Sequence, residues 1–416
     1  MSEPQEHPVR HRTRRMLGRD PHESHRAATP LELLFDLTFV VAFGTAANEL
    51  AHALAEDHVG SGIAAFAFAT FGISWAWINF TWFASAYDTD DWVYRLTTML
   101  QMVGVLIFAL GIKPTFESVT GHGETLDNDV IVWGYVVMRV AMLFQWWRAG
   151  QHDPGRRDVC RTYIVSIAVA QVMWCVLAVV DLPVGTTFAV MVIPFLVELG
   201  GPAYAERQRG GTPWHAHHVA ERYGLMVIIC LGEGMIGTMA AINALAEDGL
   251  TWEIALFTLA GTALTFGTWW CYFVVPAGEV LHARRERSLG FGYGAMALFG
   301  SIVAFGAGLH VAAYYLDHHS ELGLTATVLT VAIPVALFLA IFYAGYAMLT
   351  RSLDTFHLVL IAVTAVVLVV PVLMAQADVD LTWCLLVLSL APWVSVVGYE
   401  TVGYRHNEQV LADLEA

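Results

Sequence analysis

The sequence predicts an all-α protein, a polytopic bundle of about twelve transmembrane helices. Hydrophobic residues make up 57% of the 416 residues and charged residues only 14%, whereas soluble domains are about 25% charged. Apolar runs of roughly 20 residues, the length that a helix needs to cross the hydrocarbon core, recur along the whole chain. Lysine and arginine fall in alternate connections between these runs, as they do in multi-span membrane proteins.

The apolar runs give the spans in order. The first run begins at Leu31 and lacks the short basic region and small-residue cleavage site of a signal peptide, so this helix is expected to remain in the protein. The expected spans are residues 31–50, 61–84, 93–112, 130–149, 161–180, 184–200, 221–243, 252–276, 290–313, 324–349, 355–374 and 382–402.

These spans predict two halves, a linker and a tail at each end. The predicted parts are a basic N-terminal tail (1–30), a first six-helix half (31–200), a linker (201–220), a second six-helix half (221–402) and a C-terminal tail (403–416). The N-terminal tail combines several prolines with many Arg and His residues, so it is expected to be disordered or interfacial.

The charges of the connections predict the orientation. Basic residues occupy the N-terminal tail and every second connection, at Arg95, Arg148 to Arg161, Arg207 to Arg222, Arg284 to Arg287, Arg351 and Arg405. The other connections are acidic, with Lys113 as the exception, and contain Glu56–Asp57, Glu117 to Asp129, Asp181, Glu247–Asp248, Asp317 to Glu321, Asp378 and Asp380. Because cytoplasmic loops carry the Lys/Arg excess, both termini and the linker are predicted to be cytoplasmic.

The two halves look like parallel repeats. Leu31-Glu32-Leu33 and Ala220-Glu221-Arg222 each open a long apolar helix, and an aromatic helix follows in each half, marked by Trp75-Ala76-Trp77 and by Trp269-Trp270. An even number of spans keeps the orientation, so such repeats are related by an axis normal to the membrane and place sites at their interface. The alternative is that any two sets of six apolar helices look alike.

Composition excludes several partners. The net charge of -16 is spread thinly through loops and helix ends, so no nucleic-acid partner is predicted. The five cysteines stand singly without a Cys-x-x-Cys pair, and neither a Gly-x-Ser-x-Gly motif nor a phosphate loop is present. No cofactor is predicted, and an enzyme would have to work inside the helices. The expected partners are the lipid bilayer and a proton or small cation, and the chain is compatible with a homo-oligomer.

Glu32 and Asp36 lie four residues apart and therefore share one face of the first helix. A pair of carboxylates on one face can bind a cation, although an acid at a helix start also stabilises the helix dipole. Asp36 lies deeper, among Leu, Phe and Val, where an unpaired carboxylate is costly. Asp36 is therefore predicted to be neutral, paired or in a water-filled cleft.

Glu233 is expected near mid-membrane, inside a glycine-rich stretch (232–237) of the seventh span. Helix packing explains the glycines but not the acid. Arg139 is the basic residue expected in the membrane interior, with Glu233 or Asp36 as its counter-charge. Such a pair is either a structural clamp or part of a proton or ion path.

Two further acids are candidates for ion coupling. Glu198 follows Pro194 by one turn, where a kink frees backbone carbonyls that can coordinate an ion, although a simple kink explains the proline as well. Glu221 is about 120° around the helix from Glu233, so these two acids need different partners.

A polar cluster is expected at the cytoplasmic interface. Its predicted members are Asp88, Asp90, Asp91, Arg95, His218 and Arg222. The turn from Asp88 to Asp91 lacks the glycine and the later glutamate of a calcium loop, so it is expected to cap the third helix and to meet Arg95.

His215, His217 and His218 are the metal-ligand candidates of this sequence. His217 and Glu221 have a spacing that places ligands on one helix face. The run has no cysteine or other fixed ligand, so a polar cluster at the start of a helix explains it too. The metal is therefore left open.

Two long motifs, Pro30–Ala42 and His218–Glu233, resemble the bacterial low temperature requirement A family, as do Tyr87–Arg95, Gln101-Met102 and the stretch from Arg139 to Pro154. The resemblance implies a multi-span protein of the bacterial cytoplasmic membrane associated with growth at low temperature, in a family without an established activity. It draws attention to Glu32, Phe35, Asp36, Asp88, Asp90, Asp91, Arg95, Arg139, His218, Glu221, Arg222 and Glu233.

The leading hypothesis is a transporter- or channel-like protein in which Asp36, Glu233 and Arg139 line a polar path between the halves, with a proton or small cation coupled to Glu233. One alternative is an intramembrane enzyme or metal binder at the cytoplasmic interface. Another is a stress-related sensor or scaffold that transports nothing.

Overall fold

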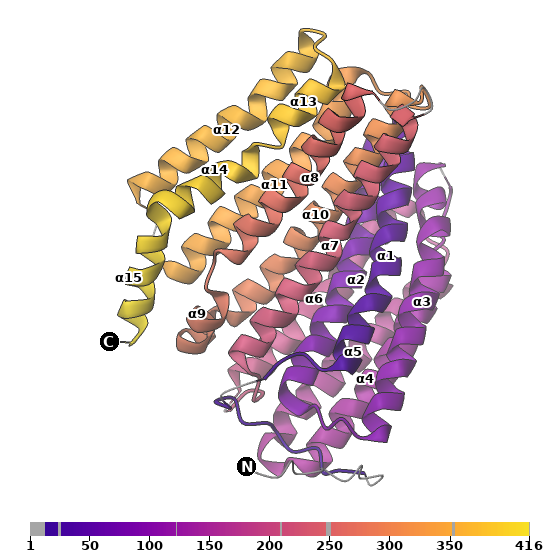
Figure 1. Cartoon of the computed structure of the whole chain (residues 1–416). Helices are drawn as coiled ribbons and strands as arrows, with labels where there is room; N and C mark the ends of the chain where they lie inside the picture. Colours follow the sequence, from indigo (N-terminus) through magenta and orange to yellow (C-terminus); the bar gives the residue numbers. More distant parts are fainter. Residues whose placement is uncertain are drawn as a thin grey trace, which may run out of the picture.

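The structure is a computed structural model, and it describes residues 13–23, 26–121, 123–208, 210–246, 251–351 and 354–415. Long helices run side by side through the described part of the chain, whose one β-bridge joins Thr125 and Pro183 (Figure 1). The expected acidic loop at Glu247–Asp248 and the first twelve residues of the N-terminal tail lie outside the described residues.

The first half contains six long helices. They are α1 (Pro30–Ala55), α2 (Val59–Tyr87), α3 (Trp92–Thr120), α4 (Asp129–His152), α5 (Arg157–Val179) and α6 (Val184–Arg207), with a short 3-10 turn at Pro154–Arg156 before α5. The expected linker at 201–220 therefore overlaps the end of α6 and the beginning of the next helix.

The second half begins with α7, and several of its spans are interrupted. Its helices are α7 (Ala216–Leu245), α8 (Trp252–Phe273), α9 (Ala277–Ala283), α10 (Ser288–Leu316), α11 (Leu324–Thr350), α12 (Thr355–Gln376), α13 (Leu381–Leu388), α14 (Ala391–Gly398) and α15 (Tyr404–Glu415). A 3-10 turn at Arg285–Arg287 precedes α10, and a π-helical turn at Tyr399–Gly403 joins α14 to α15.

The structure confirms the predicted all-α bundle, because twelve of its helical segments are long and apolar enough to cross a membrane. The twelfth expected span, 382–402, is broken into α13 and α14 around Ser389 and Leu390. Pro392 lies in the first turn of α14, where its missing N–H costs no helical hydrogen bond. The predicted parallel repeat of the two halves remains a prediction.

Helices α1, α2, α7 and α10 form the centre of the bundle. Helix α10 packs on α7, α11, α1 and α2, and α1 packs on α2, α3 and α7. Helices α6 and α12 are mostly exposed, and α12 lies at the edge of the bundle (Figure 1). The end of the bundle at which α1 and α7 begin is called the proximal end below, and the opposite end is called the distal end.

Residues 13–23 and 26–29 of the N-terminal tail pack on the proximal end, so the expected disorder is wrong for them, whereas the interfacial alternative remains a prediction. Met16 is fully buried and Arg26 is buried as well. Arg26 donates hydrogen bonds to the carbonyl oxygens of Ala84, at 2.6 Å, and Ser85. These carbonyls belong to the last turn of α2, which lacks helical donors, so the tail caps that helix.

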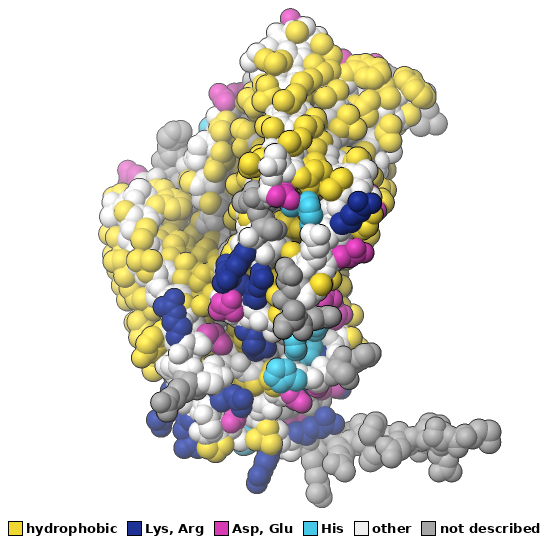
Figure 2. Space-filling view, turned by 90° about the vertical axis from the view of Figure 1, so that its left-hand side faces the viewer, with side chains coloured by type: hydrophobic (Ala, Val, Ile, Leu, Met, Phe, Trp, Pro, Cys, Tyr) yellow, Lys and Arg dark blue, Asp and Glu magenta, His cyan; other side chains and the backbone are white. Residues whose placement is uncertain are grey.

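The surface is that of a membrane protein. Large hydrophobic side chains such as Leu37, Leu110 and Val179 are exposed along the spans, where water would disfavour them but lipid does not. On the face shown in Figure 2, hydrophobic side chains cover the upper part and the left flank, whereas Lys and Arg side chains gather toward the lower part.

Candidate functional site

Arg222 of α7 lies between the two carboxylates of α1. Its Nη1 is 3.1 Å from Glu32 Oε1, and its Nη2 pairs with Asp36 Oδ1. All three side chains are buried. Because Glu32 and Asp36 are one helical turn apart, a single guanidinium reaches both acids. Arg222 was expected at the cytoplasmic interface, and the structure buries it between the first helices of the two halves.

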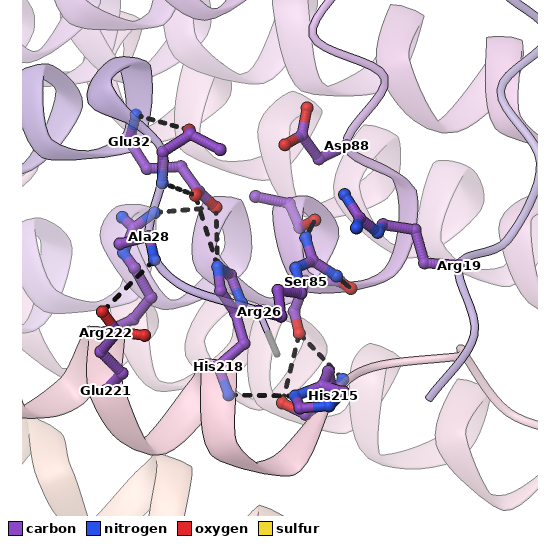
Figure 3. Close-up of polar contacts among 12 residues, drawn as sticks. Arg19, Arg26, Ala28, Glu32, Ser85, Asp88, His215, His218, Glu221 and Arg222 are labelled. Carbon is purple, nitrogen blue, oxygen red and sulfur yellow. Dashed lines mark hydrogen bonds and ion pairs between the residues drawn. The ribbon is translucent and has the colours of Figure 1, made fainter. Parts of the chain in front are cut away.

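Two further side chains complete this Arg222 cluster. Trp77 of α2 donates from its indole Nε1 to Asp36 Oδ1 at 2.7 Å. His218 Nε2 lies 3.2 Å from Glu32 Oε1, as Figure 3 shows. Glu32 also accepts a hydrogen bond from the backbone N–H of Thr29, and the Thr29 hydroxyl accepts one from the Glu32 N–H. Glu32 therefore both closes a capping box at the start of α1 and contacts Arg222 and His218 of α7.

The Arg222 cluster is incompletely satisfied. Within the described part of the chain, Asp36 Oδ2, His218 Nδ1 and Arg222 Nε are buried and have no hydrogen-bond partner. One guanidinium faces two carboxylates, so a cation or proton is needed to neutralise both acids. Buried polar atoms without partners are costly in a purely structural cluster. These unpartnered atoms indicate that the cluster can bind a further proton or cation.

Arg139 pairs with Glu198, so the predicted pairing with Glu233 or Asp36 is wrong. Arg139 Nη2 lies 3.0 Å from Glu198 Oε2, and both residues are buried. Trp75 Nε1 donates to the same oxygen at 2.6 Å, and the hydroxyl of Tyr135 donates to Oε1 at 3.0 Å. Sequence reasoning missed this pair because 59 residues separate its members, too many for a helical spacing to relate them.

Trp75 and Trp77 connect α2 to both arginine clusters. Residues two apart point to different sides of a helix, and these two indoles donate to Glu198 and to Asp36 respectively. The Trp-Ala-Trp motif was noted in the sequence only as a sign of an aromatic helix. Two indole N–H groups in a buried span also require hydrogen-bond acceptors. The motif could therefore have predicted two buried polar sites next to α2.

Glu233 lies where α7 meets α1 and α10. A β-carbon placed on Gly44 of α1 would be 3.2 Å from Glu233 Oε1, and one placed on Gly306 of α10 would be 2.7 Å from the Glu233 Cβ. Both glycines therefore leave room for this side chain. The contact line of these helices is called the α1–α7–α10 seam. Within the described part of the chain, Glu233 is 2% exposed and has neither a hydrogen bond nor an ion pair.

The glycines around Glu233 have different roles. A β-carbon on Gly234 would be 2.7 Å from the Phe305 ring, and one on Gly237 would be 2.5 Å from the Gly306 oxygen. Helix packing explains these two glycines, as expected. Gly232 has no atom within 4 Å of such a β-carbon among the described residues, so close packing does not explain it.

Polar side chains continue along the seam toward the distal end. His310 of α10 lies next to Gly237, because a β-carbon on that glycine would be 3.2 Å from His310 Cδ2. His310 Nε2 is buried and has no hydrogen-bond partner within the described residues. Farther along, the Tyr314 hydroxyl lies 3.2 Å from His52 Nε2 of α1. The sequence hypothesis did not include these three residues.

The predicted interface cluster divides into separate contacts. His218 and Arg222 belong to the Arg222 cluster. Asp91 caps α3 by accepting from the Tyr94 N–H and pairs with Arg148 of α4. Asp90 pairs with Arg95 at 2.8 Å. The expected cap and the expected contact with Arg95 are therefore confirmed, but two different aspartates make them.

Asp88 is buried at the proximal end, and no Lys, Arg or His of the described residues forms an ion pair with it. Its Oδ1 accepts a hydrogen bond from the Asp90 N–H at 2.8 Å. Burial, helped by the nearby Glu32 carboxylate, raises the pKa of Asp88 to about 6 despite the opposing charge of Arg26. Figure 3 places Asp88 near Arg26 and Arg19, on the far side of Arg26 from His218.

The histidine run at the start of α7 has structural contacts. His215 is the N-cap of α7, because its Nδ1 accepts from the His218 N–H at 3.2 Å. Glu221 Oε1 accepts from the Ala28 N–H at 3.3 Å. Among the described residues, the group of ligand-type atoms close enough for one metal belongs to Asp354, His357 and His406, and His215, His217 and His218 are not part of it.

A cavity of about 940 Å³ lies between α7, α9, α10, α11 and α15. Its acidic lining residues are Glu221, Glu279 and Glu408, and its tyrosines are Tyr272, Tyr346, Tyr399 and Tyr404. No Lys or Arg lines it within the described part of the chain. Carboxylates and aromatic faces both attract cations, so the cavity favours positive charge over negative charge.

Comparisons with known proteins agree with this membrane architecture. The sequence model of the bacterial low temperature requirement A protein (LtrA) matches residues 27–392. The chain is 26% identical over 325 residues to uncharacterized protein RA0937 of Rhizobium meliloti (strain 1021), and this region covers 74% of each chain. No solved structure matches.

Proposed function

The chain belongs to the bacterial low temperature requirement A family of multi-span membrane proteins, and we propose that it is a transporter- or channel-like protein for protons or a small cation. The proposed path follows the α1–α7–α10 seam, and Glu233 is the acid that binds the transported ion. Arg139 is not part of this path, because Glu198 neutralises it inside the first half.

The unpartnered carboxylate of Glu233 carries this proposal. Every other buried acid among the described residues has a hydrogen bond or an ion pair, namely Glu32, Asp36, Asp88, Asp91, Asp153 and Glu198. An ionised carboxylate at this depth costs several kcal/mol without a counter-charge. Glu233 is therefore expected to be protonated or to hold a cation, and exchange between these states is what an ion-coupled protein requires.

The seam supplies polar groups on both sides of Glu233. Toward the proximal end, Asp36 precedes Gly44 by eight residues of α1, which is about 12 Å along the helix. Toward the distal end, His310 follows Gly306 by four residues of α10, or about 6 Å. An ion or proton that moves along the seam would thus meet Asp36, Glu233 and His310 in turn.

The proximal end has the charge pattern expected of an entrance for cations. The two negative charges of Glu32 and Asp36 exceed the single positive charge of Arg222. Glu221 lies beside this cluster and also lines the cavity of about 940 Å³, called the acidic cavity below. We propose that this end faces the cytoplasm, with both termini, because the Lys/Arg-rich connections lie there. The parallel repeat of the halves and a homo-oligomer are compatible with this arrangement.

The test is ion flux in liposomes that contain the purified protein. Proton and cation gradients are imposed on vesicles with the wild type, with Glu233→Gln, or with Glu117→Gln as the matched control. Glu117 is exposed and pairs only weakly with Lys113. Gln keeps the shape of Glu233 but has neither its negative charge nor its exchangeable carboxyl proton. Flux is therefore expected to be abolished, while the variant unfolds at the wild-type temperature.

Two results would contradict the proposal. If the Glu233→Gln variant conducted ions at the wild-type rate, Glu233 would not be part of the path. No flux of any tested cation through correctly folded wild type would move the function to the enzyme or sensor alternatives. Loss of flux in Glu117→Gln as well would show that the assay reports damage to the fold.

A further inference from the structure

We propose that Asp354, His357 and His406 form a binding site for a zinc-type divalent metal ion, which fixes the C-terminal helix α15 to the start of α12. This site is separate from the histidines of α7 and independent of the proposed ion path. It lies at the proximal end, where α12 begins and α15 passes beside it.

The three side chains already converge. The Nδ1 atom of His357 lies 2.7 Å from Asp354 Oδ1, and His406 Nε2 lies 3.3 Å from Asp354 Oδ2. One ligand atom from each residue lies within 4.8 Å of the other two. The ligand atoms of a tetrahedral zinc site are about 3.3 Å apart, given metal–ligand bonds of about 2.0–2.1 Å, so small side-chain movements would close the site.

Local structure explains why Asp354 and His357 meet. Asp354 is the N-cap of α12 and accepts a hydrogen bond from the His357 N–H at 3.0 Å. This places the two side chains one turn apart at the beginning of the helix. The ring of His357 is buried and stacks on Tyr346, with 4.9 Å between the ring centroids. Its position is therefore fixed before any ion binds, which favours metal affinity.

His406 comes from a part of the chain that is distant in sequence. Its neighbour Asn407 accepts a hydrogen bond from the Tyr346 hydroxyl at 2.9 Å and donates one to the Val274 oxygen at 2.8 Å. These bonds tie α15 to α11 and to the end of α8. His406 Nδ1 is buried and has no hydrogen-bond partner within the described residues, so Nε2, the nitrogen beside Asp354, is the one available to a metal ion.

The donor set selects the metal. Two imidazoles and one carboxylate suit zinc and similar transition metals, whereas magnesium and calcium prefer oxygen ligands. Three protein ligands leave one position of a tetrahedron for water. Because Tyr404, Asn407 and Glu408 of α15 line the acidic cavity, an ion at this site would also hold one wall of that cavity in place.

The test is a calorimetric titration of chelator-treated, detergent-purified full-length protein with zinc. His406→Gln and Asp354→Asn are expected to lower the affinity of the site at least ~10-fold. Asn retains the N-cap of α12, so Asp354→Asn should unfold at the wild-type temperature in the absence of zinc. His319→Gln removes an exposed histidine at the distal end and should bind zinc as the wild type does.

A second readout follows α15 itself. Trypsin cleavage at the exposed Arg405 is measured with and without zinc, and zinc is expected to slow it in the wild type and in His319→Gln but not in His406→Gln. The proposal is overturned if the wild type binds no zinc, or if His406→Gln and Asp354→Asn bind zinc with wild-type affinity. It is also overturned if magnesium competes equally with zinc.

Discussion

Two buried arginines occupy neighbouring spaces of the bundle, and their surroundings differ. Both oxygens of Glu198, the partner of Arg139, accept hydrogen bonds, and the charges of this pair cancel. Arg222 faces two carboxylates, and within the described residues Asp36 Oδ2 and His218 Nδ1 remain without hydrogen bonds. A neutral ion pair fixes helices, whereas a cluster with excess negative charge and an unbonded carboxylate oxygen leaves a place for a proton or cation.

The two clusters also differ in which helices they join. The Arg139–Glu198 pair joins α4 to α6 within the first half. The Arg222 cluster joins α1 to α7, and so connects the two halves next to the seam that contains Glu233. Intramembrane charge alone therefore does not identify the functional site. Net charge and the bonding of the carboxylate oxygens distinguish the two sites, because the Nε atoms of both arginines are buried without a hydrogen-bond partner among the described residues.

The largest predicted effect on stability is at Arg139. Replacing it with Met leaves Glu198 as an uncompensated buried charge, which costs about 3–5 kcal/mol in the free energy of unfolding. Arg139→Met is compared with Arg95→Met by thermal unfolding in detergent. The Arg95–Asp90 pair is exposed and should contribute less than about 1 kcal/mol. Equal losses in the two variants would mean that the Arg139 pair is not a clamp.

The next prediction applies the same chemical change to both clusters. Glu198→Gln removes the counter-charge of Arg139 and should destabilise the protein by about 3 kcal/mol. Asp36→Asn still accepts from Trp77 and leaves Glu32 to neutralise Arg222, so the loss should stay near ~1 kcal/mol. Ion flux per folded molecule should fall in Asp36→Asn and persist in Glu198→Gln. If flux instead fell in Glu198→Gln and persisted in Asp36→Asn, the Arg139 pair would belong to the ion path and the Arg222 cluster would be structural.

A smaller loss of stability is predicted for the seam. A β-carbon on Gly306 would lie 2.7 Å from the Glu233 Cβ, whereas one on Gly300 of the same helix would meet Thr70 at 3.7 Å. Gly306→Ala should therefore separate α7 from α10 and cost about 1–3 kcal/mol. Gly300→Ala should be neutral or slightly stabilising, since alanine favours helix. Thermal unfolding of both variants tests this, and equal stabilities would contradict the close contact at Glu233.

The sequence predicted the bundle well because span length and hydropathy are local properties. It also singled out Asp36, Glu198, Glu233 and Arg139, since a charged residue in an apolar run is visible without a structure. It did not predict which acid meets which arginine, because partners on different helices depend on how the helices pack. The sequence placed His310 in a span but did not show its position beside Gly237 of α7, for a related reason. A single histidine in a span can be assigned to a site only when its neighbour on another helix is known.

The smallest predicted effect concerns Asp88, a buried acid outside the spans. Its pKa of about 6 exceeds the value of about 3.9 in an unfolded chain. The stability that Asp88 contributes is therefore present below pH 4 and is lost as the pH rises through 6.

Asp88→Asn cannot ionise, so this loss of stability with rising pH is expected to disappear, and the Asn oxygen can still accept the hydrogen bond from the Asp90 N–H. The variant should be roughly 1–3 kcal/mol more stable than the wild type at pH 7.5, with little advantage at pH 4. Asp90→Asn, in the same turn but exposed, is the control, and the unfolding of both variants is measured at pH 4 and pH 7.5. An advantage of Asp88→Asn that did not change with pH would assign the effect to packing rather than to charge.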